Sequence, residues 1–215
     1  MAIKVNEIFY SIQGESSYVG RPCVFVRLAG CNLRCSYCDT TYAYKKGKEM
    51  GLEDIFDRIT SYECSLIEVT GGEPLMQEYT PVFIERLLED GYEVLLETNG
   101  SKDISRVDER CVRILDIKCP SSGMEEHNDL DNLTQLSVND ELKFVIGSKE
   151  DYEFAKKIVN LFEMVSDGTN PVNFSPVFGK MNPKRLAEWI LKDHLNVRLQ
   201  LQIQKIIWPP GKRKV

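Results

Sequence analysis

The chain has 215 residues and a formal net charge of −6 at pH 7, with 42% hydrophobic and 28% charged residues. These values are typical of a folded globular protein, and the length suits one domain spanning residues 1–215. The acidic balance argues against nucleic acid as the main partner, because binding to phosphates requires a basic surface.

Further sequence features bear on the compartment. There is no apolar run of about 18 residues, so we expect no membrane span. The first residues lack the apolar core of a secretory signal, and an odd number of cysteines, seven, suits a reducing environment. We therefore expect a cytoplasmic protein.

In chain order, strand-like and helix-like patterns alternate after an apolar–polar stretch over residues 5–15. Strands are predicted over 23–29, 66–70, 93–98, 112–118, 141–146 and 172–177, and helices over 52–62, 80–90, 150–164 and from 182 onward. Residues 124–138 read as a loop, and 198–207 as a final strand or an extended tail. Such alternation predicts βα units, and six or seven units are fewer than the eight of a closed barrel. The expected fold class is therefore α/β, an open, partial βα barrel with about six parallel strands.

A cysteine loop directly follows the first predicted strand. Cys31, Cys35 and Cys38 have the spacing C-x3-C-x2-C, and no fourth cysteine follows at a similar interval. Structural zinc sites have four protein ligands, whereas three thiolates on a four-iron cluster would leave one iron open for a small molecule. A zinc site completed by a distant Cys or His is the alternative. We expect the remaining cysteines to pack as small apolar side chains: Cys23, Cys64, Cys111 and Cys119.

The other unusual motifs also follow predicted strands. They are Gly71-Gly72-Glu73-Pro74, Glu97-Thr98-Asn99-Gly100 and Lys118 with Pro120-Ser121-Ser122. Because ligands of parallel βα folds lie at the carboxyl ends of the strands, we expect one site there. Arg27 lies near the end of its strand, where a charge is costly without a partner. It is either paired structurally or available to an anionic ligand.

The cysteine spacing, with the aromatic Tyr37 between the second and third cysteines, resembles the radical S-adenosylmethionine (SAM) enzymes. Gly71-Gly72-Glu73-Pro74 is similar to the motif with which those enzymes hold the SAM amine. Four further segments resemble the 7-carboxy-7-deazaguanine synthase family within them: Phe9 to Ser16, the strand that carries Arg27, Cys38-Asp39-Thr40 and Asp116 to Gly123. This resemblance extends over nearly the whole chain.

The resemblance implies a carbon–nitrogen lyase that contracts the ring of 6-carboxy-5,6,7,8-tetrahydropterin to 7-carboxy-7-deazaguanine and releases ammonia. It implies a [4Fe-4S] cluster on Cys31, Cys35 and Cys38, and Mg2+ on Thr40. The implied SAM contacts are Tyr37, Gly72, Glu73, Glu97, Thr98, Asn99, Lys118 and Ser121. The implied substrate contacts are Ile12, Gln13, Gly14, Glu15, Arg27, Thr70 and the C-terminal Val215.

The same resemblance implies a homodimer, a flavodoxin or ferredoxin as the reductant, and a product used for queuosine or another 7-deazapurine. Two alternatives remain: another radical SAM enzyme, such as a glycyl-radical activase, or a zinc-binding module without enzymatic activity. The C-terminus departs from the family pattern. Gln204 stands where we expect a histidine, and the tail Pro209 to Val215 is unusually basic. We interpret its basic residues, and Lys45, Lys46 and Lys48, as solvated rather than as binding patches.

Overall fold

The computed structural model describes residues 1–163, 169–209 and 211–215. The strands are β1 (Ala2–Ile12), β2 (Pro22–Leu28), β3 (Lys48–Gly51), β4 (Leu66–Gly71), β5 (Glu93–Thr98), β6 (Val112–Ile117), β7 (Glu141–Ile146), β8 (Val172–Pro176) and β9 (Arg198–Leu199). The α-helices are α1 (Leu52–Thr60), α2 (Thr80–Glu89), α3 (Lys149–Glu163), α4 (Pro183–Lys192) and α5 (Gln204–Ile207).

All of these strands belong to one sheet with the order β3-β1-β2-β4-β5-β6-β7-β8-β9. From β2 through β9 every neighbouring pair is parallel, whereas β1 pairs antiparallel with both β2 and β3. The six predicted parallel strands and the open, partial barrel are confirmed. The predictions missed β1 and β3, which extend the sheet at one edge.

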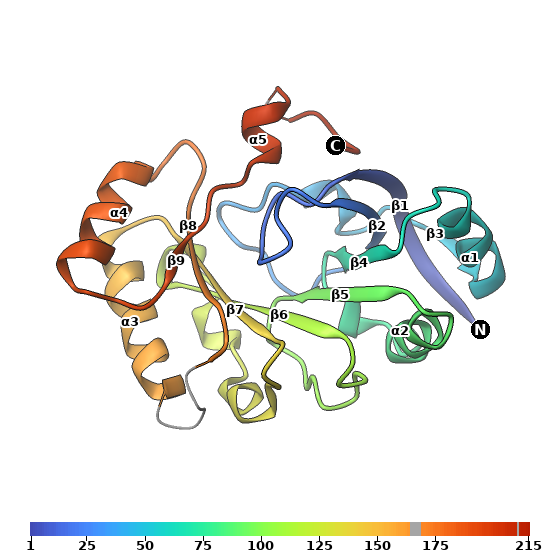
Figure 1. The fold of residues 1–215 in the computed structure, drawn as a ribbon, viewed down its shortest axis with the longest axis horizontal. Coiled ribbons are helices and arrows are strands. Elements are labelled where there is room, and N and C mark those ends of the chain that lie inside the picture. The colour runs from blue at the N-terminus through green and yellow to red at the C-terminus, as the bar shows by residue number, and fades with distance from the viewer. Residues whose placement is uncertain (164–168, 210) are drawn as a thin grey trace.

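The outward face of the sheet is packed by helices on both halves (Figure 1). One apolar cluster joins α1 and α2 to β1, β2, β4 and β5, and a second joins α3 and α4 to β6, β7 and β8. In each strand alternate residues point to opposite faces, so only every second side chain enters these clusters. In β4, for example, Ile67 and Val69 belong to the first cluster.

The inward face changes character along the strands. Near the amino ends of the strands it is apolar, with a cluster formed by Phe9, Cys23, Phe25, Leu66, Leu95, Val112 and Ile114. Farther along β2, β4, β5 and β6, and on β7, the inward positions are polar or charged: Arg27, Glu68, Thr70, Glu97, Asp116 and Lys143. The carboxyl ends of the strands therefore surround a polar interior.

The helices follow the predicted positions closely. Proline in the first turn of α2 and α4 suits a position where no backbone N–H is needed for the helix. Residue 164, the predicted end of the third helix, lies outside the described residues, as does residue 210 of the tail. The stretch 198–207 resolves into the short β9 and α5. Among the described residues no helix is long and apolar enough to cross a membrane.

Candidate active site

A cavity of about 320 Å3 opens at the carboxyl ends of the strands. Predicted residues that line it are Ile12, Gln13, Gly14, Glu15, Arg27, Cys35, Tyr37, Cys38, Thr40, Thr70, Glu97 and Val215. They come from both ends of the chain, and α5 and the C-terminus lie together apart from the other helices (Figure 1). The structure thus brings two of the three predicted cysteines, the substrate residues and the terminal residue into one cavity. Predicted residues that do not line it are Cys31, Gly72, Glu73, Thr98, Asn99, Lys118 and Ser121.

The cysteine loop is held in place by backbone contacts on two sides. The Glu73 N–H donates to the Gly30 carbonyl at 2.7 Å, and the Ser36 N–H donates to the Ser122 carbonyl at 3.0 Å. All three loop thiols are half-buried, and burial raises the pKa of Cys31 and Cys35. Within the described residues no group of three His, Cys, Asp or Glu could hold a single metal ion.

Gly72 lies too close to the cysteine loop for any side chain. A Cβ placed on Gly72 would lie 2.0 Å from the Gly30 carbonyl oxygen and 2.8 Å from the Cys31 Cβ. Real atoms cannot approach so closely, so only glycine permits this contact. The Gly-Gly motif therefore brings its backbone directly against the first cysteine of the loop.

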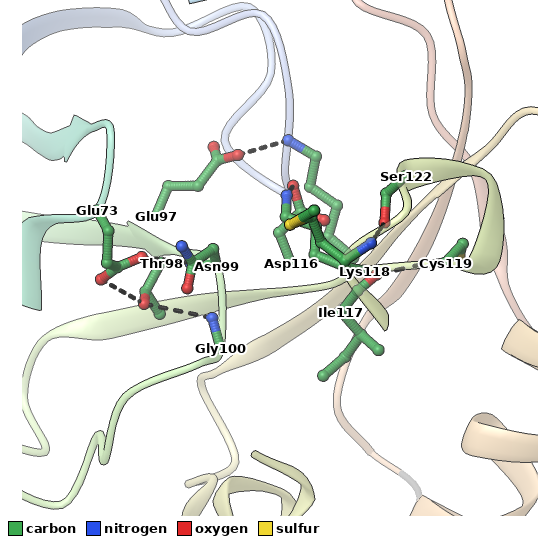
Figure 2. A network of polar contacts seen from close by, with 12 residues as sticks. Glu73, Glu97, Thr98, Asn99, Gly100, Asp116, Ile117, Lys118, Cys119 and Ser122 are labelled. Atoms are coloured by element: carbon green, nitrogen blue, oxygen red, sulfur yellow. Dashed lines mark hydrogen bonds and ion pairs between the residues drawn. The ribbon is translucent and has the colours of Figure 1, made fainter. Parts of the chain in front are cut away.

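Glu73 links the loop after β4 to the end of β5 through its side chain (Figure 2). Its side chain is fully buried and accepts hydrogen bonds from the Leu75 N–H at 2.9 Å, the Thr98 hydroxyl at 2.9 Å and the Asn99 N–H at 2.7 Å. Burial raises the pKa of Glu73, and the three donors oppose that shift. Thr98 thus donates to Glu73, and these two side chains connect the loop after β4 with the end of β5.

Two more of the predicted SAM contacts lie beside the cysteine loop. The Asn99 side-chain amide donates to the Asn32 side-chain oxygen at 3.2 Å and lies 4.0 Å from the Cys31 sulfur. The Ser121 hydroxyl bonds to Asp151, and its carbonyl accepts from the Ser36 hydroxyl at 2.7 Å. The loop after β5 therefore contacts the cysteine loop at Asn32, and the loop after β6 contacts it at Ser36.

Lys118 forms an ion pair with Asp116, its Nζ lying 2.7 Å from Oδ2 (Figure 2). Although burial disfavours the charged ammonium, Asp116 raises the pKa of Lys118. The other carboxylate oxygen of Asp116 is buried with no hydrogen-bond partner among the described residues, and so is the Tyr37 hydroxyl. Such buried, unpaired polar atoms are unusual, and they can receive a ligand.

Gln13 and Glu15 are held by a network inside the cavity. The Gln13 amide donates to Glu68, and its oxygen accepts from the Glu15 N–H at 3.1 Å. The Glu15 carboxylate accepts from the side-chain amides of Gln202 and Gln204, each at 2.9 Å. Gln13 therefore fixes the loop that carries Glu15.

Lys143 is a central residue that the sequence predictions missed. Its buried ammonium lies 2.7 Å from Glu15 and 2.6 Å from Glu97. These carboxylates raise the pKa of Lys143 although burial opposes it, and Lys143 lowers the pKa of Glu15 below its ordinary value against the effect of burial. The cation therefore joins a predicted substrate residue to a predicted SAM residue.

Arg27 is paired structurally, but only in part. Its Nε donates to Glu7 at 3.0 Å, and the Glu7 side chain is 2% exposed. The same carboxylate accepts from the Tyr42 hydroxyl at 3.0 Å and from Arg213 at 3.0 Å. The terminal nitrogens of Arg27 have no hydrogen-bond partner among residues 1–163, 169–209 and 211–215. Arg27 is therefore paired structurally through Nε, and its terminal nitrogens remain available, so binding of an anionic ligand there stays a prediction.

Thr40 lies at the cavity beside Asp39, to which its hydroxyl donates at 3.0 Å. Asp39 is paired with Lys205 of α5 at 2.6 Å. Burial alone would raise the pKa of Asp39, but Lys205 and the Thr40 hydroxyl bring it below its ordinary value. Two oxygen-bearing side chains of the kind that Mg2+ prefers therefore lie together here.

Comparison with known proteins identifies the family. The radical SAM superfamily matches residues 26–190. The chain is 47% identical to the 7-carboxy-7-deazaguanine synthase of Chlorobaculum tepidum, over 99% of this chain and 97% of that protein. It is 43% identical to the protein of the same name from Koribacter versatilis, over 99% and 100%. The chain belongs to the 7-carboxy-7-deazaguanine synthase family of radical SAM enzymes.

A solved structure supports the fold of this family. The structure superposes on the crystal structure of QueE from Escherichia coli with a TM-score of 0.78 and 23% sequence identity. The match covers 94% of this chain and 94% of that chain. The open α/β sheet is therefore shared along almost the whole length.

The residues present fit the cofactors of a radical SAM enzyme, which are a [4Fe-4S] cluster and SAM. The thiols of a cluster bind different irons, so they need not converge on one point, unlike the ligands of a single zinc ion. Cys35 and Cys38 line the cavity, and the backbone of Gly72 lies directly beside Cys31. Family membership and this geometry favour the cluster over the zinc interpretation.

Proposed function

We propose that this protein contracts the ring of 6-carboxy-5,6,7,8-tetrahydropterin to give 7-carboxy-7-deazaguanine and ammonia, in the biosynthesis of queuosine or another 7-deazapurine. The names of its relatives support this reaction. The single observation that carries it is one cavity that joins the cysteine loop to a buried acid, Glu15, and a partly unpaired guanidinium, Arg27. An anionic heterocycle with an amine-bearing edge needs both groups.

In this proposal the polar residues of the cavity bind and orient the pterin. Glu15 accepts from the N–H groups of the guanidine-like edge, and backbone groups of Ile12 and Gly14 complete that contact. Arg27 presents its terminal nitrogens to the carboxylate, a geometry that suits a guanidinium. Thr70 borders the same space from the end of β4.

When bound, the cluster and SAM supply the radical chemistry, and the chain supplies orientation and exclusion of water. The residues that would hold SAM line the cavity or lie beside Cys31. They are Tyr37, Gly72, Glu97 and Asn99. Glu73 and Thr98 position the loops that present them. In this proposal no side chain of the protein acts as the main general acid or base.

We also propose that Mg2+ binds at Thr40, with the substrate and water completing its shell. The hydroxyl of Thr40 and the carboxylate of Asp39 support this assignment, because Mg2+ takes hard oxygen ligands and few of them from protein. A homodimer, a flavodoxin or ferredoxin as reductant and a cytoplasmic location complete the proposal.

Mass spectrometry of an anaerobic reaction tests the function. The reaction contains cluster-reconstituted protein, SAM, reductant, Mg2+ and 6-carboxytetrahydropterin. A product smaller by one ammonia, with SAM not consumed in proportion, is the expected result. SAM cleavage with an untouched pterin would reject the substrate and redirect the search to a glycyl-radical activase.

A cysteine pair provides the control for the cluster. Cys35→Ala removes one loop thiol and should abolish product, whereas Cys111→Ala changes a buried cysteine outside the cavity. Iron content separates the two variants independently of turnover. Full iron content in Cys35→Ala would reject the cluster assignment.

A further inference from the structure

The basic tail lines one edge of the cavity, while residues 211–214 remain exposed to solvent as expected. Residues 211–215 all line the cavity beside Arg27 and Tyr42. Arg213 packs over the Tyr42 ring with its guanidinium carbon 3.7 Å from the ring centre. The contact of Arg213 with Tyr42 places one basic residue of the tail beside the predicted substrate residue Arg27.

A single buried carboxylate holds Arg213 next to Arg27. Glu7 accepts from Arg27 Nε through Oε1 at 3.0 Å and from Arg213 Nη2 through Oε2 at 3.0 Å. The Tyr42 hydroxyl also donates to Oε1. Each carboxylate oxygen therefore faces one guanidinium, and the two cations are fixed at the same edge of the cavity.

The charges of this group do not balance. Glu7 contributes one negative charge and the two arginines contribute two positive charges, which leaves an excess of one. Glu7 lies between the two guanidinium groups and offsets one of their charges, and the remaining positive charge attracts a further anion. Phe9 and Phe25 line the same cavity and stack with ring centres 5.0 Å apart, and the Arg27 guanidinium lies 6.0 Å from the Phe9 ring centre. The group is thus suited to take up one further anion.

We propose that Arg213 is a second guanidinium for the substrate carboxylate, held beside Arg27 by Glu7 and Tyr42. This inference rests on the proposed function, because it names a further residue at the same substrate site. Glu7 and Tyr42 act through the arginines and are positioning residues. The atypical tail thereby carries part of the recognition of the substrate.

A cycle of two proteins and two ligands tests the contact to the carboxylate. The protein carries its cluster and SAM, and the probes are 6-carboxypterin, an aromatic form that cannot react, and pterin, which lacks the carboxylate. Fluorescence titration gives the Kd of each. Arg213→Ala should raise the Kd of 6-carboxypterin about tenfold and the Kd of pterin by less than about twofold. Only 6-carboxypterin has the carboxylate that makes the charge-assisted bond. Arg213→Lys should restore part of the loss.

Arg185→Ala is the matched control, because Arg185 is exposed on α4 and does not line the cavity. The Kd of SAM should be the same in all variants. Equal weakening of both pterins in Arg213→Ala would show a general effect of the tail and overturn the inference, as would no weakening of either. Binding of neither pterin by the unaltered protein would instead reject the proposed function and the inference with it.

Discussion

The two faces of the sheet are built from the same strands but have opposite chemistry. In β4, Ile67 and Val69 face outward into an apolar cluster, whereas Glu68 and Thr70 face inward. In β7, Phe144 packs outward and Lys143 points inward toward Glu15 and Glu97. The outward face stabilises the fold by removing apolar surface from water, and the inward face places charges where burial is costly.

A buried ion pair elsewhere shows what distinguishes the cavity. Arg113 and Asp140 are almost fully buried and pair at 2.5 Å, and Arg113 also donates to backbone carbonyls. Asp140 accepts from the Arg113 and Ser137 N–H groups, so this pair is well satisfied and secures a loop. At the cavity, in contrast, Asp116 and Tyr37 each keep a buried side-chain oxygen without a hydrogen-bond partner among the described residues. The pair that secures a loop is thus satisfied, whereas these two groups at the cavity are not.

The largest effect on activity is expected from Lys143→Met. This change removes the only cation that contacts both Glu15 and Glu97 in the described part of the chain, and their carboxylates then repel each other or take up protons. Displacement of the two groups should reduce kcat/KM by about a hundredfold. Steady-state assays measure this loss.

The control for this variant is Lys156→Met, which breaks a half-buried ion pair with Asp193. Neither residue lines the cavity, so the activity of this variant should stay within about twofold of the unaltered protein. If Lys143→Met were as active as this control, the inward charges would have no role in positioning.

The outward face should show the opposite behaviour. Ile67→Ala leaves a cavity in the cluster under α1 and α2, and it should lower the free energy of unfolding by about 2–4 kcal/mol. The folded fraction should retain its kcat, because Ile67 does not line the cavity. Urea unfolding and assays at low temperature measure the two effects. A loss of kcat in folded protein would contradict the separation of the two faces.

The strands and the cysteine loop were predictable from the sequence, because the patterns that indicate them involve residues close together in the chain. Alternation along short runs such as 66–70 and 112–118 predicts strands, and the cysteine spacing predicts the metal loop without reference to distant residues. The inward position of Lys143 also had a signal, since a lysine between Leu142 and Phe144 interrupts a core strand as Glu68 does. No sequence signal, however, indicated that Lys143 would contact Glu15 and Glu97.

Long-range contacts account for what the sequence could not predict. Glu15 and Gln202 are separated by 187 positions, and Arg213 and Glu7 by 206. No periodicity connects such residues, and their pairing depends on how the tail crosses the carboxyl ends of the strands. For this reason Arg27 remained ambiguous until Glu7 and Arg213 were located beside it.

A moderate effect that depends on pH is expected from Glu68→Gln. Burial, and next the charge of Glu97, raise the pKa of Glu68 to about 8, against the effects of Gln13 and Lys143. A carboxyl with a raised pKa in the folded state contributes stability at low pH and loses it as pH rises through that value. Above pH 8 the glutamine variant, which cannot ionise, should therefore be more stable than the unaltered protein, by on the order of 2 kcal/mol.

Urea unfolding at several pH values between about 5 and 9 measures this difference. Glu63→Gln is the matched control, since Glu63 is exposed at the end of α1 and should leave the pH profile unchanged. A constant difference between Glu68→Gln and the unaltered protein over this range would show that Glu68 does not carry the extra proton.

The smallest effect is expected from Ser175→Ala, which tests whether the whole inward face serves the ligand. Ser175 is buried on β8, and its hydroxyl has no hydrogen-bond partner among the described residues. It does not line the cavity. Removing an unsatisfied buried hydroxyl should leave stability unchanged or raise it by about 1 kcal/mol, with kcat and KM unaffected. Thermal unfolding and a substrate titration measure both. An increased KM would instead place Ser175 in contact with the bound ligand, and the functional part of the inward face would then extend to β8.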